Sequence, residues 1–441
     1  MKVETLGAAR IPSPLGLSRT RGDRMVNYIP ERARVLLQVN LDPEEKCEGE
    51  PESLEKAGPR EKLFFDPARV TAGIVTCGGL CPGLNNVIRG LTLELYLRYG
   101  VRRVIGFRYG YAGLVPEAGH PPRELTPESV DDIFAAGGTI LGTSRGRQKV
   151  ETMVDTLARL GVDILFCIGG DGTLRGAWEI HREIRRRGLQ IGIAGIPKTI
   201  DNDIDLLDRS FGFETAFSVS SHILSAAHSE AISHYNGIAL VKLMGRDSGF
   251  IAASAALAFP SVNFVLIPEL DFSLDGPQGF LSVLRRRLEA KHHALIVVSE
   301  GAGQNLFPGG RLQPDSSGNT PYHDIGLHLK DRISRHCREN GMSFTVKYID
   351  PSYIIRSVPA IPDDAKFSTI LAQYAVHGAM AGKTGFVIGR LHQEYVNIPI
   401  PLAIRQRKRI DLESQLWLDV LQATGQPVFL GHTEPSPKEP Q

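Results

Sequence analysis

The chain has 441 residues, of which 42% are hydrophobic and 22% are charged, and its formal net charge at pH 7 is +1. This length exceeds what one hydrophobic core usually supports, so we expect two domains in an ordinary soluble protein. The balanced charge speaks against a nucleic-acid-binding face, and five scattered cysteines exclude a disulfide framework or a zinc site built on paired cysteines.

Residues 1–69 are rich in proline and acidic residues and show no sustained hydrophobic period, apart from a short apolar run at 35–39. We therefore expect an extension that lies on or beside the main body. No charged-then-apolar signal pattern begins the chain, and polar residues interrupt its most apolar stretch, 251–268. These features predict a cytoplasmic protein with no membrane or nucleic-acid partner.

From residue 70 onward, apolar strand-like runs alternate with segments of helical periodicity. The expected strands are 70–76, 104–107, 163–168, 190–196, 237–242, 263–267, 294–299 and 385–388. The expected helices are 85–99, 174–187, 250–258, 279–290, 325–339 and 369–381. Such alternation indicates βαβ units, so we predict an α/β fold of two stacked three-layer domains, with mostly parallel sheets and an active-site cleft between them.

A glycine-rich loop, Gly-Gly-Asp-Gly-Thr at 169–173, follows the strand expected at 163–168. Glycines allow a phosphate to approach the backbone closely, and the following helix directs free N–H groups at anions. Asp171 is a ligand for Mg²⁺, and Thr173 is a candidate helix cap. A tight strand-to-helix turn with a capping threonine is the alternative interpretation of this pentapeptide taken alone.

An acidic loop at 197–205 follows the next strand and carries Asp201, Asp203 and Asp205 at alternate positions. It is not a calcium loop, because Leu206 stands where that loop requires glycine. Lys198 and Thr199 precede the acids directly, and a carboxylate in this setting accepts the proton of an attacking hydroxyl. A solvated acidic turn is the alternative, but the two loops together favour a kinase.

Two further glycine motifs resemble nucleotide sites. The loop at 77–86 lacks the spacing of a dinucleotide fingerprint, which disfavours NAD, and its two cysteines are expected to be small buried thiols. The Gly-Lys-Thr at 382–384 resembles the end of a Walker A loop, but His377 occupies the position of the required glycine. We attribute that match to chance.

Charged residues also follow strands in the second half of the chain. Arg246 lies in the loop 244–249, Glu300 follows the strand 294–299, and Arg356 lies downstream of Lys347. Arginine offers a planar fork for a phosphoryl group, and a carboxylate accepts sugar hydroxyls. For any one of these residues alone, a surface ion pair is the simpler interpretation.

Taken together, from about residue 70 to about residue 405, these motifs resemble those of the 6-phosphofructokinase family, and the long extension is similar to that of its plant-like and long-chain bacterial branch. The resemblance implies Mg²⁺-dependent transfer of the γ-phosphoryl group of ATP to fructose 6-phosphate by a homodimer or homotetramer. It also implies that 70–213 with about 355–405 bind the nucleotide, and that 214–354 with about 406–441 bind the sugar phosphate.

The resemblance further implies a role for individual residues. Those expected to bind ATP are Gly79, Arg145, Gly146, Gly170, Asp171, Gly172 and Thr173, with Asp171 on Mg²⁺. Those expected to bind fructose 6-phosphate are Thr199, Ile200, Asp201, Met244, Gly245, Arg246, Glu300, Lys347, Tyr353 and Arg356. Asp201 would be the general base, Thr199 and Arg246 would steady the transferred group, and Asp203 would lie near the metal.

The phosphoryl donor depends on two positions. Gly172 favours ATP, because the pyrophosphate-dependent branch commonly has aspartate there, whereas Lys198 is shared with that branch. We give Gly172 more weight, since a steric block is harder to evade than an added cation. A pyrophosphate-dependent 6-phosphofructokinase is the alternative, and a lipid or NAD kinase sharing only the first glycine loop is a more distant one.

Overall fold

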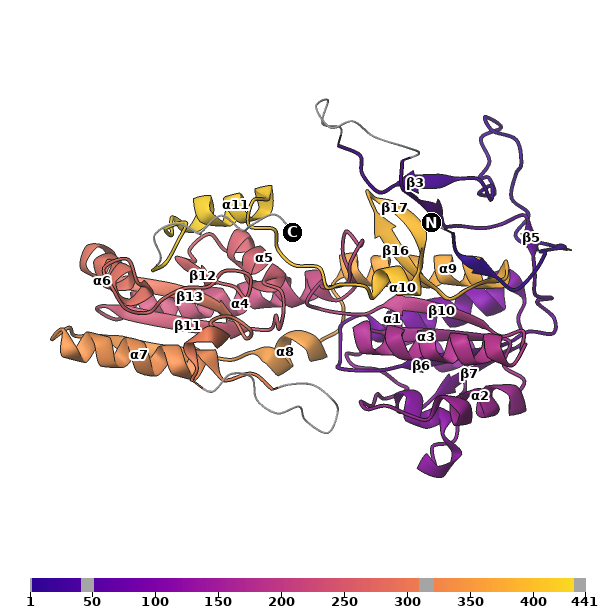
Figure 1. The fold of residues 1–441 in the computed structure, drawn as a ribbon, viewed down its shortest axis with the longest axis horizontal. Helices are drawn as coiled ribbons and strands as arrows, with labels where there is room; N and C mark the ends of the chain where they lie inside the picture. The colour runs from indigo at the N-terminus through magenta and orange to yellow at the C-terminus, as the bar shows by residue number, and fades with distance from the viewer. Residues whose placement is uncertain (1, 41–50, 309–320, 432–441) are drawn as a thin grey trace. The chain divides into compact units, whose positions relative to one another are not determined.

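The computed structural model describes residues 2–40, 51–308 and 321–431 (Figure 1). The chain forms two compact units. Unit 1 comprises Met1–Ile200, Ile204–Glu214 and Arg356–Arg407, and unit 2 comprises Asp201–Asp203, Thr215–Ile355 and Lys408–Gln441. The predicted extension 1–69 belongs to unit 1 and does not form a body of its own.

Unit 1 is built on a nine-stranded sheet with the order β3-β4-β17-β16-β10-β9-β6-β7-β8. Its central strands β16, β10, β9, β6 and β7 are parallel, and the outer strands pair antiparallel. The strands are β3 (Arg34–Leu36), β4 (Ser53–Lys56), β6 (Thr71–Thr76), β7 (Arg103–Phe107), β8 (Arg123–Glu124), β9 (Ile164–Gly169), β10 (Gly192–Pro197), β16 (Phe386–Leu391) and β17 (Glu394–Pro399).

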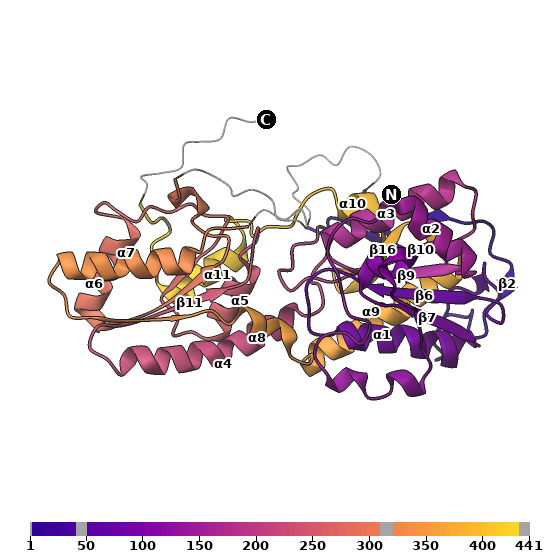
Figure 2. The same ribbon diagram turned by 90° about the horizontal axis from the view of Figure 1, so that it is seen from below.

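Helices cover both faces of this sheet, with α1 and α9 on one face and α2, α3 and α10 on the other (Figure 2). They are α1 (Leu84–Leu93), α2 (Val150–Arg159), α3 (Asp171–Arg186), α9 (Pro362–Met380) and α10 (Ile400–Ala403). A π-helical turn, η1 (Glu94–Tyr99), continues α1, and short 3₁₀ turns are η2 (Gly110–Leu114), η3 (Pro116–Ala118), η4 (Glu128–Val130) and η5 (Ile133–Ala135). The central strands β9 and β10 are apolar throughout, as is typical of parallel strands with both faces covered.

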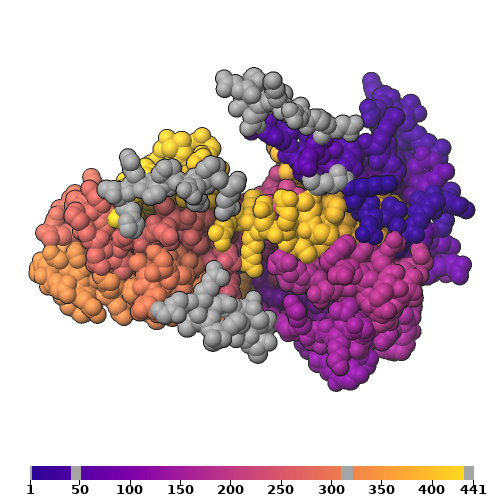
Figure 3. Space-filling view, viewed as in Figure 1, coloured from indigo at the N-terminus to yellow at the C-terminus, as the bar shows by residue number. Residues whose placement is uncertain are grey.

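Two small sheets order the N-terminal residues of unit 1, and the first of them joins these residues to the C-terminal part of the unit. Strand β1 (Glu4–Thr5) pairs with β15 (Lys383–Thr384), and β2 (Ile11–Pro12) pairs with β5 (Lys62–Leu63). In the space-filling view the indigo N-terminal residues lie on the outside of this unit (Figure 3).

Unit 2 contains a four-stranded, fully parallel sheet with the order β12-β13-β11-β14. Its strands are β11 (Gly237–Leu243), β12 (Phe264–Leu266), β13 (His293–Ser299) and β14 (Thr345–Ile349). Its helices are α4 (Phe213–Ile232), α5 (Phe250–Ala258), α6 (Phe280–Lys291), η6 (Gln304–Leu306), α7 (Ile325–Glu339), α8 (Ser352–Ser357) and α11 (Gln415–Thr424). The first two residues of α4 and the last two of α8 belong to unit 1. Helices α5 and α11 pack together, and α7 contacts β11 and β14.

The predicted α/β class is confirmed, and the predicted elements are present with small shifts of their ends. Several elements differ from the prediction. The expected helix 85–99 is α1 followed by the π-turn, and α9 begins at Pro362, earlier than predicted. Strand β17 was not predicted, because it forms a hairpin with β16 through His392 and Gln393, both of which have positive φ. Within the described residues, no helix is long and apolar enough to cross a membrane.

Candidate active site

In unit 1, the loops that follow β6, β9 and β10 meet at one edge of the sheet, because parallel strands end on the same side. The Lys198 N–H donates to Gly169 O at 3.0 Å, and the Cys77 N–H donates to Ile168 O at 3.0 Å. The Lys198 ammonium donates to Gly79 O at 2.6 Å. The three predicted loops are therefore held together by hydrogen bonds between them.

Helix α3 begins inside the glycine-rich loop, with Gly170 as its N-cap residue. The prediction that Thr173 caps this helix is wrong, since no side-chain cap bond is present among the described residues. Thr173 is instead buried in the first turn, and its carbonyl accepts a hydrogen bond from Tyr111 at 2.7 Å. At this end of α3 the Thr173 N–H donates to Gly170 O at 2.9 Å, whereas the N–H groups of Asp171 and Gly172 have no hydrogen bond among the described residues. These two N–H groups are left for a ligand.

Packing within the protein requires glycine at one position of this loop and not at another. A Cβ on Gly169 would lie 2.1 Å from Thr173 Oγ1, so packing within the protein requires glycine there. A Cβ on Gly172 would meet no heavy atom of the described residues within 4 Å. Because Gly172 is exposed on the first turn of α3, packing does not explain its identity, and the space beside it is open.

Asp171 is the first residue of α3 and the predicted metal ligand. Its Oδ2 accepts a hydrogen bond from Arg175 Nε at 3.0 Å, and a quarter of its side chain is exposed. Arg175 also donates to Ile404 O at 2.8 Å, which fixes the guanidinium. No group of three or more His, Cys, Asp or Glu side chains suited to a metal occurs among the described residues.

Three predicted binding residues converge at the loop after β6. A Cβ built on Gly79 would lie 3.5 Å from Arg145 Nη2 and 3.8 Å from Arg356 Nη1. Gly79 and Arg145 were predicted to bind ATP, and Arg356 was predicted to bind the sugar phosphate. The two guanidinium groups therefore approach one backbone position in unit 1, and the neighbouring Gly146 is exposed.

The acidic loop carries the chain from one unit to the other. Ile200 belongs to unit 1, whereas Asp201–Asp203 belong to unit 2. The Ser248 hydroxyl donates to Asp201 O at 2.9 Å, and the Lys408 N–H donates to Asp203 O at 2.9 Å. On the unit 1 side, Thr199 O accepts a hydrogen bond from Ser210. The backbone of the predicted catalytic acids is thus held by unit 2.

In unit 2, the loops after β11 and β13 pack directly against each other. The Glu300 N–H donates to Leu243 O at 2.9 Å, and the Gly301 N–H donates to Gly245 O at 3.1 Å. A Cβ on Gly301 would lie 1.8 Å from Arg246 O, so this close approach needs glycine. Met244, Gly245, Arg246 and Glu300, all predicted to bind the sugar phosphate, are therefore assembled at one edge of the smaller sheet.

The side chain of Arg246 is supported by an aromatic residue that the sequence analysis missed. Its guanidinium lies over the Tyr322 ring, 4.9 Å from the centroid, and the Tyr322 hydroxyl donates to Asp247 Oδ1 at 2.9 Å. Stacking of this kind orients the guanidinium fork. No local pattern marks Tyr322, because it meets Arg246 only through tertiary contact.

Lys347 and Tyr353 are placed differently from the other predicted sugar-phosphate residues. Lys347 lies within β14, and its ammonium is 3.9 Å from Glu230 Oε2 on α4. Tyr353 lies on α8 and is 75% exposed. Within unit 2, the structure thus does not place Lys347 on a strand-end loop with Arg246.

An ion-pair cluster of one lysine and two aspartates in unit 2 was not predicted. Lys242 on β11 forms ion pairs with Asp324 at 3.1 Å and with Asp350 at 2.9 Å. Burial alone would lower the pKa of Lys242, but hydrogen bonds to Asp350, Tyr348 and Asp324 outweigh it and raise the pKa. Lys242 therefore stays charged and ties the start of α7 to the segment after β14.

Cys77 and Cys81 are buried thiols, as predicted. Among the described residues, Cys77, Cys81, Cys167 and Cys337 are all buried and none of them forms a disulfide, and Cys47 lies outside the described residues. Burial raises the pKa of Cys167 to about 12, and burial also raises the pKa of Cys77. Thiols in this state are poor nucleophiles at neutral pH, which speaks against a redox role.

Comparison with known proteins decides the family. The family profile described as Phosphofructokinase matches residues 71–379. The chain belongs to the phosphofructokinase family. It is 47% identical over 435 residues to the ATP-dependent 6-phosphofructokinase of Borreliella burgdorferi, covering 97% of both chains. It is 48% identical over 440 residues to the ATP-dependent 6-phosphofructokinase of Amycolatopsis methanolica, covering 98% of this chain and 96% of that one.

Solved structures of the family share the fold at much lower identity. The pyrophosphate-dependent phosphofructokinase of Nitrosospira multiformis superposes with a TM-score of 0.66 at 18% identity, covering 84% of this chain and 94% of that chain. At this identity the likeness concerns the fold alone. The two-unit α/β architecture is therefore that of a phosphofructokinase.

Proposed function

We propose that this protein transfers the γ-phosphoryl group of ATP to the 1-hydroxyl of fructose 6-phosphate, giving fructose 1,6-bisphosphate and ADP. Family membership supports the reaction class, and relatives named ATP-dependent 6-phosphofructokinase are 42% to 50% identical to this chain. The observation that carries the choice of donor is the open space beside Gly172 in the first turn of α3.

The argument from Gly172 is steric and electrostatic. The free N–H groups and the positive dipole end of α3 favour phosphate at this position. A side chain at residue 172 would project into the space where the described residues leave room, and a carboxylate there would also repel a phosphate. Since packing does not demand glycine, its presence is best explained by a ligand larger than pyrophosphate.

The pyrophosphate-dependent alternative rests on Lys198. This residue is buried, and its ammonium donates to Gly79 O in the loop after β6. That bond gives Lys198 a role in fixing a loop, which serves either donor equally well. Lys198 therefore does not outweigh Gly172.

Within the proposed reaction, Asp201 accepts the proton of the attacking 1-hydroxyl, and Arg246 and Thr199 steady the transferred group. Most of the catalysis is positioning and charge neutralisation, as in other phosphoryl transfers. The contacts that support this assignment are the Ser248 bond to the Asp201 backbone and the stacking of Arg246 on Tyr322.

The metal we propose is Mg²⁺, held by Asp171 with Asp203 nearby. Asp171 fits this role, because it is partly exposed and its Oδ1 has no hydrogen bond among the described residues. When bound, Mg²⁺ neutralises charge on the transferring phosphates. We also propose that the protein acts in the cytoplasm as a homodimer or homotetramer, which light scattering of the purified protein would test.

Replacing Asp201 with asparagine tests the proposed general base. We expect kcat to fall about 10² to 10⁴-fold, with little change in ATP affinity, because the amide cannot accept the proton. The matched control is Asp205→Asn, which removes a carboxylate from the same loop; among the described residues, its Oδ1 accepts only the N–H of Leu206, at 3.0 Å. Equal kcat losses in both variants, or a kcat near that of the unmodified protein for Asp201→Asn, would remove Asp201 as the base.

A further inference from the structure

A glutamate of unit 2 that the sequence analysis did not single out, Glu269, joins two segments that lie far apart in the chain. It follows β12 and is half-buried. Its Oε1 accepts hydrogen bonds from two backbone N–H groups, that of Gly249 at 3.0 Å and that of Ile410 at 2.9 Å. One carboxylate oxygen therefore fixes the distance between the loop after β11 and the segment that precedes α11.

The first of these segments holds Asp201. The hydroxyl of the buried Ser248 donates to Asp201 O at 2.9 Å, and Gly249 is the next residue and the N-cap of α5. A Cβ on Gly249 would clash with Ile267 Cγ2 and would lie 3.1 Å from Glu269 Oε2. The chain thus approaches Glu269 too closely for a side chain at position 249, and this packing sets the position of Ser248.

The second segment holds Asp203. The Lys408 N–H donates to Asp203 O at 2.9 Å, two residues before Ile410. The Lys408 ammonium also lies 5.0 Å from the centre of the Phe250 ring, which belongs to the first turn of α5. Helix α11, which follows this segment, packs on α5 (Figure 1). The two segments are therefore neighbours along their length, and Glu269 joins them at the end that holds the acids.

Asp201 and Asp203 need such support because the backbone between them is strained. Asn202 has a φ of 56°, in the left-handed region that residues other than glycine rarely adopt, and it is buried. A conformation of this kind costs free energy and persists only where the surrounding structure fixes it. The carbonyl groups on either side of Asn202 are the ones that Ser248 and Lys408 hold.

The two N–H groups need an oxygen acceptor but no negative charge. Glu269 Oε2 is shielded from solvent and has no hydrogen-bond partner among the described residues. Burial raises the pKa of Glu269 above the ordinary value of a glutamate, although the N–H groups of Ile410 and Gly249 act in the opposite direction. The amide oxygen of glutamine also accepts two hydrogen bonds. Glutamine should therefore replace Glu269, whereas alanine should not.

We propose that Glu269 is a positioning residue for phosphoryl transfer: it fixes the two segments that hold the backbone of Asp201 and Asp203. The inference rests on the proposed function, in which Asp201 accepts the proton of the sugar hydroxyl. Glu269 acts through these two acids and not on the reacting atoms. Its effect on rate is large because a displacement of a catalytic group by about 1 Å costs roughly 10²-fold.

Steady-state kinetics of Glu269→Ala and Glu269→Gln with ATP and fructose 6-phosphate measures this effect. In Glu269→Ala, kcat should fall about ten- to hundredfold, because the acids are no longer held in place. The KM for ATP should change less than about threefold, since the ATP-binding loops lie in unit 1. In Glu269→Gln, kcat should stay within about threefold of the unmodified protein, because both hydrogen bonds are kept.

The matched control is Asn263→Ala, at the start of β12, whereas Glu269 follows the end of that strand. Asn263 is buried, and its Oδ1 accepts the Leu295 N–H at 2.9 Å. This variant also loses a side-chain oxygen that accepts a backbone N–H of unit 2. It should lose stability in denaturant unfolding and keep its kcat per folded protein.

Combining Glu269→Ala with Asp201→Asn separates positioning from a general loss of structure. If Glu269 acts through Asp201, its removal costs little once the base is gone, so the double variant should have nearly the kcat of Asp201→Asn alone. A structural lesion would lower kcat by the same factor in both backgrounds. If Glu269→Ala does not fold, Glu269→Asp takes its place, because the shorter side chain cannot reach both N–H groups.

Hydrogen exchange tests the contacts without turnover. The N–H groups of Gly249, Ile410 and Lys408 should exchange roughly three- to tenfold faster in Glu269→Ala than in the unmodified protein. In Glu269→Gln their exchange should be unchanged. Equal exchange in the alanine variant and the unmodified protein would overturn the inference.

The kinetic outcomes distinguish this inference from the proposed function. Absence of turnover in the unmodified protein would overturn the proposed function, and with it the role of Glu269. With turnover present, three results overturn the role of Glu269 alone. They are an unchanged kcat in Glu269→Ala, an equal loss of kcat in Glu269→Gln and Glu269→Ala, and an equal factor of loss with and without Asp201→Asn.

Discussion

Replacement of Gly172 by alanine and by aspartate separates the demands of the ligand from those of the fold. A Cβ at this position meets no heavy atom of the described residues within 4 Å, and the backbone is the first turn of α3. Alanine is a better helix former than glycine, so Gly172→Ala should raise stability by about 0.4 to 1 kcal/mol. Any loss of activity therefore reports an effect on the substrate.

The expected loss of activity differs between the two variants. The methyl group of Gly172→Ala reduces the room for ATP and should raise its KM. The carboxylate of Gly172→Asp adds like-charge repulsion, which at 4 Å amounts to about 1 kcal/mol in water and about 4 kcal/mol at an effective dielectric constant of 20. The kcat/KM for ATP should then fall roughly 5 to 1,000-fold, since each 1.4 kcal/mol is a factor of ten.

Steady-state kinetics with varied ATP, alongside denaturant unfolding, measures both effects. The comparison variant is Gly169→Ala, whose Cβ would lie 2.1 Å from Thr173 Oγ1 and which should therefore lose stability as well as activity. If Gly172→Asp used ATP as well as the unmodified protein does, the steric and electrostatic reasoning about this position would be refuted.

Three further predictions concern other parts of the molecule. Burial raises the pKa of Glu94 from 4.5 to about 7, so the stability that its protonated form contributes is complete below pH 4.5 and is lost as pH rises through 7. In denaturant unfolding, Glu94→Gln should therefore match the unmodified protein at pH 4.5 and be more stable at pH 8, by up to about 3 kcal/mol. Equal stability at pH 8 would contradict the burial argument. Gly301→Ala places a Cβ 1.8 Å from Arg246 O and should raise the KM for fructose 6-phosphate at least about tenfold in steady-state kinetics. Circular dichroism should show no loss of secondary structure. An unchanged KM would show that this loop is not part of the sugar site. Lys198→Met removes the hydrogen bond to Gly79 O, which contributes about 1.5 to 3 kcal/mol. The variant should turn over more slowly, with the same ratio of ATP use to pyrophosphate use. A changed ratio would mean that Lys198 determines which phosphoryl donor is used.

The alternation of strands and helices could be predicted because it rests on local periodicity. Apolar runs such as Ile164–Gly169 and Gly192–Pro197 carry their own signal, and glycines such as Gly100 and Gly188 mark helix ends. The outer antiparallel strands depend on pairing between distant segments. Arg34–Leu36 and Ser53–Lys56 join the main sheet only through β17, and such partners are not encoded in either segment alone.

For the candidate site, the positions of the loops could be predicted from the sequence, but the contacts between them could not. The loops at strand ends could be located, because the chemistry of glycine, aspartate and arginine is visible in the sequence. The approach of Arg145 and Arg356 to Gly79 could not, because these residues lie far apart in the chain and meet through the fold. The same holds for Tyr322 beneath Arg246 and for the hydrogen bond from Lys198 to Gly79 O.

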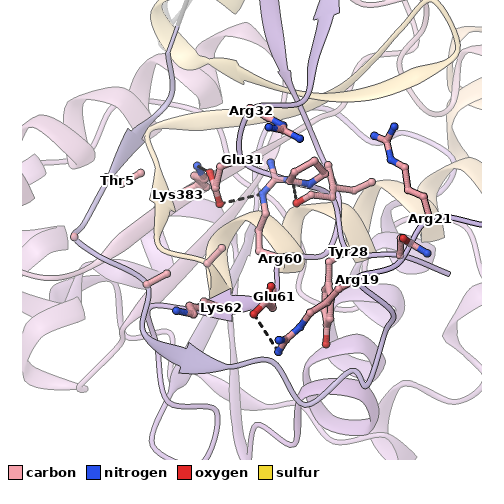
Figure 4. Close-up of a pocket in the computed structure, with 16 residues that line it drawn as sticks. Thr5, Arg19, Arg21, Tyr28, Glu31, Arg32, Arg60, Glu61, Lys62 and Lys383 are labelled. Carbon is pink, nitrogen blue, oxygen red and sulfur yellow. Dashed lines mark hydrogen bonds and ion pairs between the residues drawn. The ribbon is translucent and has the colours of Figure 1, made fainter. Parts of the chain in front are cut away.

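The ion pairs around a cavity lined by the N-terminal residues (Figure 4) could not be predicted from the sequence either. Lys383, which belongs to a chance match with a Walker A loop, proves to be buried against Glu55 and Glu31. The sequence of residues 1–69 suggested only an extension. Several of its charged residues line one hollow only because the pairing of β1 and β5 brings them together.

The central claim is that the open position at Gly172 admits ATP as the phosphoryl donor. The most direct test is a side-by-side turnover assay of the purified protein with fructose 6-phosphate and Mg²⁺, using ATP in one arm and pyrophosphate in the other, with the product identified by phosphorus NMR. We expect fructose 1,6-bisphosphate to form with ATP at a rate at least about a hundredfold above that with pyrophosphate. Product formation in the pyrophosphate arm with none in the ATP arm would contradict the account.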